Sequence, residues 1–251
     1  MALLEVNNLK KIYTTRFGGN QVEALKSMNF SVEEGEYVAI MGESGSGKTT
    51  LLNILAALDR PTAGDVFLNG KALSDIRERD LAAFRRSHLG FVFQDFLLLD
   101  GLTIRDNIML PRIIGGKISS SMEKSADLLC DLFGISHIKN KYPADISGGE
   151  RQRTAVARAL INNPELILAD EPTGNLDSKS AQAVIDAFLR AKNELSATIF
   201  MVTHDSFAAS FCDRVIILRD GGVWRTLARG EKDRRTFQDE LLDAVREMGE
   251  A

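Results

Sequence analysis

The chain has 251 residues, 44% of them hydrophobic, which predicts one α/β domain, alone or with a small inserted subdomain. Its 31 basic and 35 acidic residues give a net charge of −4, which argues against a general nucleic-acid binder. The first residues become charged too soon for a signal peptide, and no apolar run approaches the roughly 18–20 residues that span a bilayer. Any membrane role is therefore expected to come through a partner.

Alternating apolar residues near the start predict an antiparallel pair of strands. Residues 2–6 form the first, 11–13 follow, a glycine-containing turn comes at 18–20, and 22–32 form the second. Tyr13 has two interpretations. It is either an ordinary strand aromatic, which the residue alone favours, or a flat face for a purine ring.

The segment 42–49, Gly-Glu-Ser-Gly-Ser-Gly-Lys-Thr, fits the phosphate-loop pattern G-x-x-x-x-G-K-[ST] between an apolar strand at 37–41 and a helix at 50–56. Glycines let backbone N–H groups approach phosphates closely, and the helix N-terminus adds further donors. Lys48 supplies a charge for the outer phosphates, and the Thr49 hydroxyl can ligate Mg²⁺. The predicted nucleotide contacts are Gly42, Ser44, Gly45, Ser46, Gly47, Lys48, Thr49 and Thr50.

After this loop the sequence predicts a strand at 65–70 that closes on Asn-Gly, a charged helix at 76–86 and a core strand at 88–93. Gln94 follows this last strand. A polar residue at the carboxyl end of a core strand is where α/β proteins bind ligands, but a capping or turn glutamine is an equal alternative.

Residues 95–146 change character and predict an inserted helical subdomain. A capping box at 103–106 opens a short helix that Pro111 is expected to disrupt, and a second helix at 121–133 stops at Gly134. The apolar segment 96–99 is either a partner surface or part of the core of this insert. Cys130 and Cys212 lack metal-type spacing, so we expect buried thiols.

A second glycine-rich loop, Ser147-Gly148-Gly149-Glu150, precedes a helix at 151–160. Ser147 could act only as an N-cap, worth about 1 kcal/mol. One cap rarely needs two adjacent glycines, so a second anion site is the favoured interpretation.

Acidic and histidine side chains follow two later strands. Asp170 and Glu171 come after an apolar strand at 166–169, where Asp170 suits Mg²⁺ and Glu171 suits orienting a water toward a γ-phosphate. His204 follows a strand at 197–203, and structural and chemical roles are about equally favoured. Asp177 lies in a polar turn before a helix at 180–192, and a hairpin at 214–225 with a helix at 233–248 gives a C-terminal segment at 220–251.

These motifs, in this order, resemble the nucleotide-binding subunit of ABC transporters over nearly the whole chain. Tyr13 matches the adenine-stacking aromatic, 42–49 the phosphate loop, Gln94 the Q-loop and 147–150 the signature motif. Asp170 and Glu171 match the Walker B aspartate and the catalytic glutamate, Asp177 the D-loop and His204 the switch histidine. Glu150 departs from the glutamine that is most common in the family, which adds a charge near the partner's nucleotide.

The resemblance implies a single domain at 1–251: a P-loop NTPase α/β core, an N-terminal antiparallel β-subdomain and an inserted helical subdomain. It implies an ATPase that uses Mg²⁺, held by Thr49, Gln94 and Asp170, with Lys48, Gln94, Glu171 and His204 in catalysis. Two copies are expected to sandwich two ATP molecules head to tail, so that Ser147, Gly148, Gly149, Glu150 and Asp177 contact nucleotide. The chain is then expected at the cytoplasmic face of the cell membrane, on an integral membrane permease, without nucleic acid.

Within the family, several stretches resemble the branch that serves macrolide export, lipoprotein release and antimicrobial-peptide resistance. They are 91–96, 102–103, 107–108, 110–111 and 170–177. Three C-terminal stretches, 201–205, 208–210 and 233–237, are similar to the bacitracin- and lantibiotic-resistance type of Gram-positive bacteria, which suggests a sensor kinase as a further partner through the permease. The alternatives are another complex of the branch, a cell-division complex, or a soluble ABC ATPase that acts on ribosomes or DNA.

Overall fold

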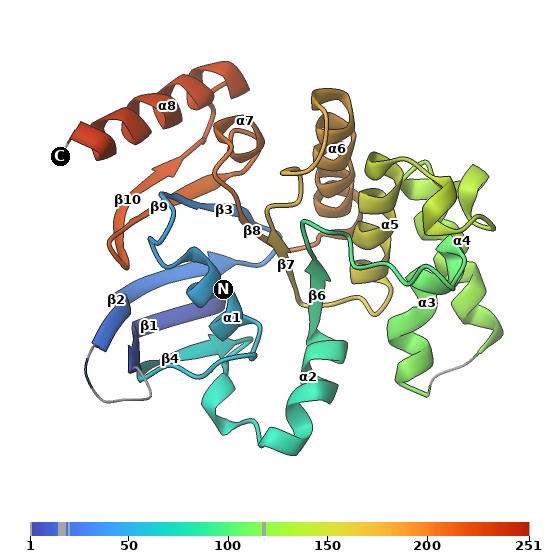
Figure 1. Cartoon of the computed structure of the whole chain (residues 1–251), viewed down its shortest axis with the longest axis horizontal. Coiled ribbons are helices and arrows are strands. Elements are labelled where there is room, and N and C mark those ends of the chain that lie inside the picture. Colours follow the sequence, from blue (N-terminus) through green and yellow to red (C-terminus); the bar gives the residue numbers. More distant parts are fainter. Residues whose placement is uncertain (1, 15–18, 20, 117–118, 251) are drawn as a thin grey trace. The chain divides into compact units, whose positions relative to one another are not determined.

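The computed structural model of the chain describes residues 2–14, 19, 21–116 and 119–250 (Figure 1). They form two compact units: Met1–Leu81 with Phe200–Ala251, and Ala82–Ile199. Among the described residues, no helix is both long enough and apolar enough to cross a membrane. The segment 95–146 falls within the second unit, and its bounds as a subdomain stay a prediction.

The first unit contains an antiparallel sheet in the order β2-β1-β4-β5. Its strands are β1 (Ala2–Thr14), β2 (Gln21–Glu33), β4 (Ala63–Leu68) and β5 (Lys71–Ala72). Residues 2–6 and 11–13 belong to one strand, because register shifts after Val6 let β1 continue past the polar Asn7 and Asn8. Most of the predicted turn at 18–20 lies outside the described residues.

A second group of strands in this unit has the order β10-β9-β3-β8. β3 (Tyr37–Gly42) runs parallel to β9 (Arg214–Arg219), which forms a hairpin with β10 (Gly222–Ala228). β8 (Ile199–Val202) lies next to β3, and just after it the Thr203 amide donates to the Ile40 carbonyl at 3.0 Å. β3, β8 and β9 are apolar and fully buried at their centres, whereas β10 has no buried residue.

The helices of the first unit cover these strands. α1 (Lys48–Leu55) follows β3 after the loop 43–47 and buries Leu51, Leu52, Ile54 and Leu55. α7 (Ser206–Ala209), which the sequence analysis did not predict, contacts α8 (Arg234–Glu250). In Figure 1, α8 lies along the β9–β10 hairpin, and it buries Phe237, Leu241, Ala244 and Met248.

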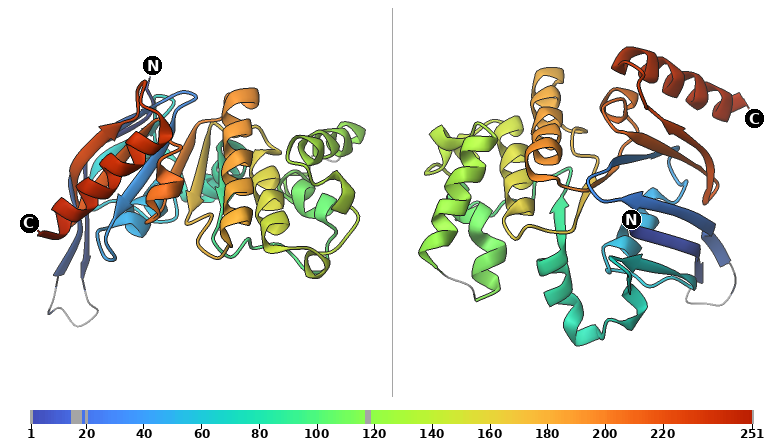
Figure 2. Two further views of the ribbon diagram at one scale, coloured as in Figure 1. Left: turned by 90° about the horizontal axis from the view of Figure 1, so that it is seen from above. Right: turned by 180° about the vertical axis from the view of Figure 1, so that it is seen from behind.

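The second unit combines two parallel strands with a group of helices. β6 (Leu89–Val92) pairs with β7 (Leu166–Asp170). The helices are α2 (Leu81–His88), which begins at the unit boundary, α3 (Ile104–Ile114), α4 (Ser120–Leu132), α5 (Gly148–Leu160) and α6 (Ser178–Leu195). α5 contacts β6, α3, α4 and α6, so it is the central helix of this unit (Figure 2). Cys130 is buried here, and Cys212 is buried in the first unit, as expected.

Two local predictions are wrong. The helix predicted to start at Ile76 begins at Leu81, because Ile76 and Arg77 are extended and separate two short 3-10 turns, 73–75 and 78–80. Pro111 does not disrupt α3, which continues to Ile114; the capped start at Thr103 and packing on α5 outweigh one lost donor.

For the apolar segment 96–99 the sequence left two alternatives, a partner surface or part of the core. Leu97 and Leu99 are 56% and 49% exposed, so the segment is not core, and the partner surface stays a prediction.

Candidate functional site

The loop between β3 and α1 has the backbone shape that its glycines predict. Gly42, Gly45 and Gly47 have φ angles of 154°, 83° and 100°, where other residues are strained. A Cβ at Gly42 would lie 2.4 Å from the Leu218 carbonyl oxygen, and one at Gly47 would lie 2.6 Å from that of Ala24. The neighbouring backbone therefore holds this loop in one shape, which only glycine permits at 42 and 47.

The start of α1 is suited to an anion. Its N-cap is Gly47, which has no side-chain acceptor, and the buried Ser46 hydroxyl has no hydrogen-bond partner among the described residues. The Lys48 ammonium donates to the carbonyls of Gly42 and Glu43, both at 2.8 Å, and so lies folded over the loop. A buried hydroxyl without a partner costs free energy, and a phosphate at this helix end would satisfy it together with the first amides.

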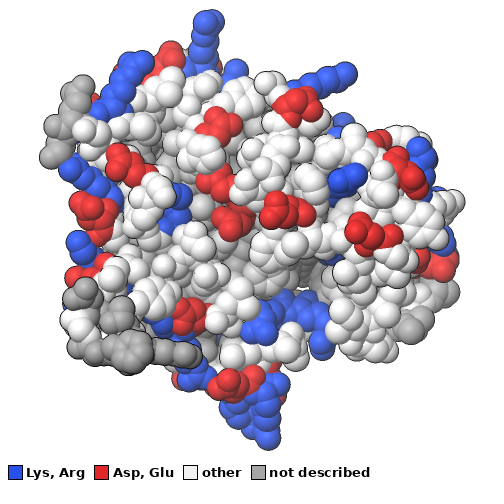
Figure 3. All heavy atoms as spheres, viewed as in Figure 1, with Lys and Arg blue, Asp and Glu red and all other residues white. Residues whose placement is uncertain are grey.

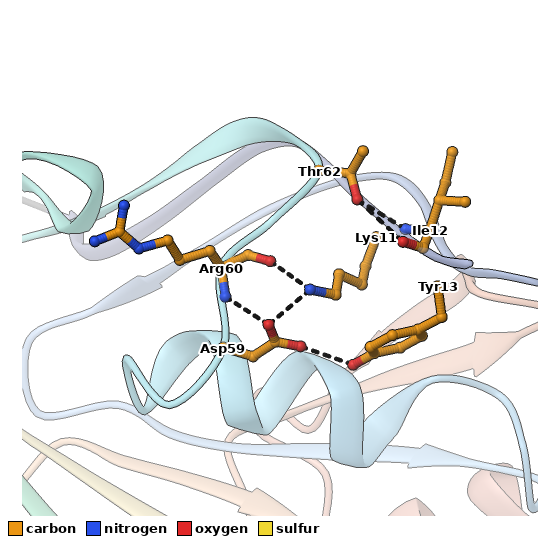
Figure 4. A network of polar contacts seen from close by, with 6 residues as sticks. All are labelled: Lys11, Ile12, Tyr13, Asp59, Arg60 and Thr62. Carbon is orange, nitrogen blue, oxygen red and sulfur yellow. Dashed lines mark hydrogen bonds and ion pairs between the residues drawn. The ribbon is translucent and has the colours of Figure 1, made fainter. Parts of the chain in front are cut away.

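Tyr13 lies at the end of β1 with 42% of its surface exposed (Figure 4). Its phenol donates to Asp59 at 2.8 Å, and the Lys11 ammonium lies 4.8 Å from the ring centre. Partial burial and the bond to Asp59 raise the pKa of Tyr13, and the nearby Thr50 hydroxyl acts in the opposite direction. Because Thr50 belongs to the first turn of α1, an exposed aromatic ring lies beside the phosphate loop, which favours the purine interpretation.

His204 is exposed and follows β8, the strand next to the one that leads into the phosphate loop. The helix cap in this segment is Asp205, which accepts from the Phe207 amide at 2.8 Å. His204 therefore does not cap α7, and its chemical role stays a prediction.

In the second unit, Gln94 lies against the turn that follows β7. Its amide donates to the Asn175 side chain at 3.1 Å, and Asn175 donates to Asp95 at 3.0 Å. A Cβ at Gly174 would lie 3.0 Å from the Gln94 amide nitrogen. Gln94 is therefore held beside the turn and does not cap its own strand.

Asp170 ends β7, and Glu171 follows with φ of 44°, a conformation that is rare for a non-glycine residue. Strain of this kind is typical of functional positions. Gln152, a residue that the sequence analysis missed, is fully buried in α5 and donates to the carbonyls of Pro172 at 2.7 Å and Phe93 at 3.1 Å. It ties together the segments after β6 and β7. A polar residue on the buried face of a helix is the signal that could have identified it.

The 147–150 loop opens α5 with a complete capping box. The Ser147 amide and hydroxyl donate to the Glu150 carboxylate at 2.9 and 2.7 Å, and the Glu150 amide donates back to the Ser147 hydroxyl at 3.4 Å. The His137 ring lies 3.1 Å from the other carboxylate oxygen. Partial burial opposes the charge on Glu150, but these bonds prevail and lower its pKa. Ser147 is thus an N-cap, and its anion role stays a prediction.

The glycines of this loop also serve packing. Gly149 is buried against Ser180, whose Cβ would lie 3.0 Å from a Cβ at that position. The Ser180 hydroxyl donates to Asp177 at 2.7 Å, and Asp177 caps α6 by accepting from the Lys179 and Ser180 amides. These bonds, led by those from Ser180, lower the pKa of Asp177. The loop and Asp177 therefore meet at the start of α6.

The predicted site residues divide between the two units. The first unit holds Tyr13, residues 42–50 and His204. The second unit holds Gln94, residues 147–150, Asp170, Glu171 and Asp177. Within each unit the residues lie at the ends of strands, on the loops that follow strands, or at the starts of helices, and α/β proteins bind ligands at such strand ends.

No group of three or more His, Cys, Asp or Glu side chains suited to a metal occurs among residues 2–14, 19, 21–116 and 119–250. Mg²⁺ commonly needs only one or two protein ligands, because water and phosphate oxygens complete its shell. Thr49, Gln94 and Asp170 stay the predicted ligands of such an ion.

Comparisons with known proteins agree with this chemistry. The model of the ABC transporter family matches residues 25–174. The chain is 48% identical to the uncharacterized ABC transporter ATP-binding protein YvcR of Bacillus subtilis, over 99% of this chain and 96% of YvcR. It is 44% identical to the bacitracin export ATP-binding protein BceA of Halalkalibacterium halodurans, over 99% of this chain and 98% of BceA.

A solved structure is similar as well: the ATP-binding cassette MJ0796, a dimer in a post-hydrolysis state with ADP and phosphate. It matches with a TM-score of 0.79 and 39% identity, over 90% of this chain and 98% of MJ0796. The antiparallel β-part, the α/β core and the helical part are those of this fold, as predicted. From its phosphate loop, its fold and these relatives, the chain belongs to the ABC transporter family, as an ATP-binding subunit that hydrolyses ATP.

Proposed function

We propose that two copies of this chain bind two Mg-ATP head to tail and drive a membrane permease from its cytoplasmic face, in resistance to antimicrobial peptides. The observation that carries the dimer is the pair of glycine-rich loops, each at the start of a helix in a different unit. In a head-to-tail pair, the phosphate loop of one copy faces the 147–150 loop of the other. Both loops then act on the same nucleotide.

Each predicted site residue has its own role at that nucleotide. Lys48 and the amides of the loop 42–50 hold the phosphates, and Tyr13 stacks on adenine. Glu171 orients the attacking water and His204 contacts the γ-phosphate. Thr49, Gln94 and Asp170 would hold Mg²⁺, which neutralises phosphate charge when bound. Asp177 and the 147–150 loop act on the partner's nucleotide.

The permease contact is proposed at a cavity of about 420 Å³ in the second unit. Its lining is apolar, with Phe91, Phe93, Leu97, Leu110, Pro111 and Ile114, and it also includes Arg85, Arg86 and Arg158. Figure 3 shows basic side chains gathered over α2, which contributes two of these arginines. An amphipathic cytoplasmic helix of the permease with an acidic residue fits such a groove.

Arg158 makes one wall of this groove rigid. Its guanidinium donates to the carbonyls of Phe96, at 2.7 Å, and Leu97, two residues with φ of 61° and 48°. Burial lowers the pKa of Arg158 to about 10, so the side chain stays charged at neutral pH. The wall begins two residues after Gln94, which gives the permease contact a short path to the proposed site.

The substrate class rests on similarity to the BceA protein, whose name assigns it to bacitracin export. A sensor kinase that works through the permease is part of the same proposal. Copurification of the tagged Glu171→Gln chain from its native host, with ATP and mild detergent, tests the partner. A permease with a large extracellular domain supports peptide resistance. A four-span permease favours macrolide, lipoprotein or cell-division complexes. Ribosomes or nucleic acid in place of a membrane protein would overturn the proposal.

Glu171→Gln also tests the chemistry. We expect ATP binding to persist, turnover to fall by about 10²–10⁴-fold, and the closed dimer to accumulate. The matched control is Glu165→Gln, which removes a carboxylate just before β7 that pairs with His88. Near-normal turnover in Glu171→Gln would contradict the role of Glu171.

Sharing between subunits can be measured in mixed dimers. Ser147→Arg in only one subunit should impair the nucleotide site lined by the other subunit's Lys48. Full activity of that site would contradict the head-to-tail arrangement.

A further inference from the structure

We infer that Lys11 and Asp59 are positioning residues that hold the Tyr13 ring ready for the nucleotide base. The inference rests on the proposed stacking of Tyr13 on adenine and names the residues that make this contact possible. We call Lys11, Tyr13 and Asp59 the Tyr13 clamp. All three lie in the first unit, and Figure 4 shows them together.

Asp59 is the centre of the Tyr13 clamp. One carboxylate oxygen accepts from the Tyr13 phenol at 2.8 Å, and the other accepts from the Lys11 ammonium at 2.6 Å. The Asp59 amide donates to the Asn53 carbonyl within α1, so the carboxylate is fixed to the helix that begins at the phosphate loop. One helix thus locates both the phosphate contacts and the aromatic ring.

Lys11 fixes the orientation of the ring. Its side chain is only 12% exposed, and the ammonium also donates to the Arg60 carbonyl at 2.7 Å. It lies 4.8 Å from the Tyr13 ring centre, within the range of a cation–π contact. With Lys11 against the ring, the exposed part of Tyr13 is left for a flat partner.

The backbone around the Tyr13 clamp is anchored as well. The Thr62 amide donates to the Lys10 carbonyl at 2.8 Å, and the Ile12 amide donates to the Thr62 hydroxyl at 2.9 Å. Partial burial opposes the charge on Asp59, but the bonds from Lys11, Tyr13 and the Arg60 amide prevail and lower its pKa. Asp59 is therefore charged across the neutral range, and the clamp does not depend on pH there.

A ring that is ordered in advance binds more tightly, because the nucleotide does not have to immobilise it. Asp59→Ala and Lys11→Met should each weaken ADP binding by about three- to tenfold, the factor expected for ordering one side chain on binding. Pyrophosphate has no base, so its affinity should not change. ADP and pyrophosphate are the probes because the protein is expected to hydrolyse neither of them. Neither is expected to close the proposed dimer.

Two further variants sharpen the test. Arg60→Ala is the matched control, because only main-chain groups of Arg60 contact the Tyr13 clamp, and its ADP affinity should equal that of the wild type. Tyr13→Phe keeps the ring but loses the bond to Asp59, so it should weaken ADP binding as much as Asp59→Ala. The double variant of Tyr13→Phe and Asp59→Ala should bind ADP about as weakly as either single variant, because both changes remove the same hydrogen bond.

The possible results distinguish the role of the Tyr13 clamp from the stacking of Tyr13 on adenine. Tyr13→Ala with wild-type ADP affinity would overturn the stacking and the clamp together. A weakened Tyr13→Ala beside an unchanged Asp59→Ala would overturn the clamp alone. If Asp59→Ala also loses pyrophosphate binding, its fold is damaged and Tyr13→Phe decides: wild-type ADP affinity there overturns the clamp.

Discussion

The helices α1 and α5 both begin at glycine-rich loops, yet their first turns differ in chemistry. α1 begins at Gly47 without a side-chain cap, beside a buried Ser46 hydroxyl that has no partner among the described residues, and it carries Lys48. α5 begins at Ser147, and the side chains of Ser147 and Glu150 bond to each other's amides. The first helix start is open and cationic, whereas the second is capped and anionic.

A helix N-terminus attracts anions only where its amides are not already satisfied. The Ser147 hydroxyl now donates to Glu150, so it has to turn away before it can donate to a phosphate. In the proposed dimer, this rearrangement would accompany closure. ATP would then stabilise the closed state through a contact that the open state lacks.

Of the changes that would test this difference between the starts of α1 and α5, a change in the first loop should have the largest effect. Gly47→Ala places a Cβ 2.6 Å from the Ala24 carbonyl oxygen at a φ of 100°. Steric strain and the unfavourable backbone together should weaken ADP binding by about a hundredfold or more. Calorimetric titration with ADP measures this loss.

The control for that change lies in the same loop. Gly45 also has a positive φ, of 83°, but a Cβ there would meet nothing within 4 Å. Gly45→Ala therefore carries only the left-handed backbone cost of about 1–2 kcal/mol and should lose about tenfold. Equal losses in the two variants would mean that contact with Ala24 does not determine the shape of the loop.

Ser147→Ala tests the second helix start and should have an intermediate effect. It removes an acceptor for the Glu150 amide, and because that bond is long, at 3.4 Å, we expect a loss of about 0.5–1 kcal/mol in unfolding free energy. ADP binding should not change, while ATP-driven dimerisation of the Glu171→Gln form should weaken.

The matched control is Ser119→Ala. Ser119 is the N-cap of α4 but makes no side-chain cap hydrogen bond. Denaturant unfolding should show almost no change for this variant. If Ser147→Ala and Ser119→Ala lowered the unfolding free energy equally, the capping box would not explain the stability of α5.

The first loop could be predicted from the sequence because every rule involved is local. An apolar strand, glycines with fixed spacing, a lysine and a helix lie within 37–56, and the structure has β3, the loop and α1 there. The cap at Thr103 and the stop at Gly134 are local in the same way, and both are present.

Predictions failed where tertiary packing outweighed local preference. α3 continues through Pro111 because its buried face packs on α5, and Ile76 is extended although its neighbours favour a helix. The apolar composition of segment 96–99 could not decide between a partner surface and core. Arg158, about 60 residues away along the chain, holds it as an exposed wall.

The finer features of the site also depend on contacts distant in sequence. No local pattern indicates that Glu171 has a positive φ, or that Gln152 in α5 tethers the segments after β6 and β7. Likewise, His137 precedes Glu150 by a turn and a 3-10 helix, so their contact follows only from the packed structure.

The smallest expected effect concerns the charge of Glu150, whose pKa is lowered by bonds from Ser147 and His137 that outweigh partial burial. A carboxyl with a lower pKa in the folded state stabilises the fold above its ordinary pKa of about 4.3, and the contribution is lost as the pH falls through the lowered value. Glu150→Gln keeps an acceptor for the Ser147 amide but not the charge. Its unfolding free energy should be about 0.2–0.5 kcal/mol below wild type at pH 7, and the two should converge in acid. Glu123→Gln, which removes an exposed charge from the first turn of α4, is the control, and it should show a smaller difference. A Glu150→Gln difference that is independent of pH would mean that the capping box needs the shape of the side chain but not its charge.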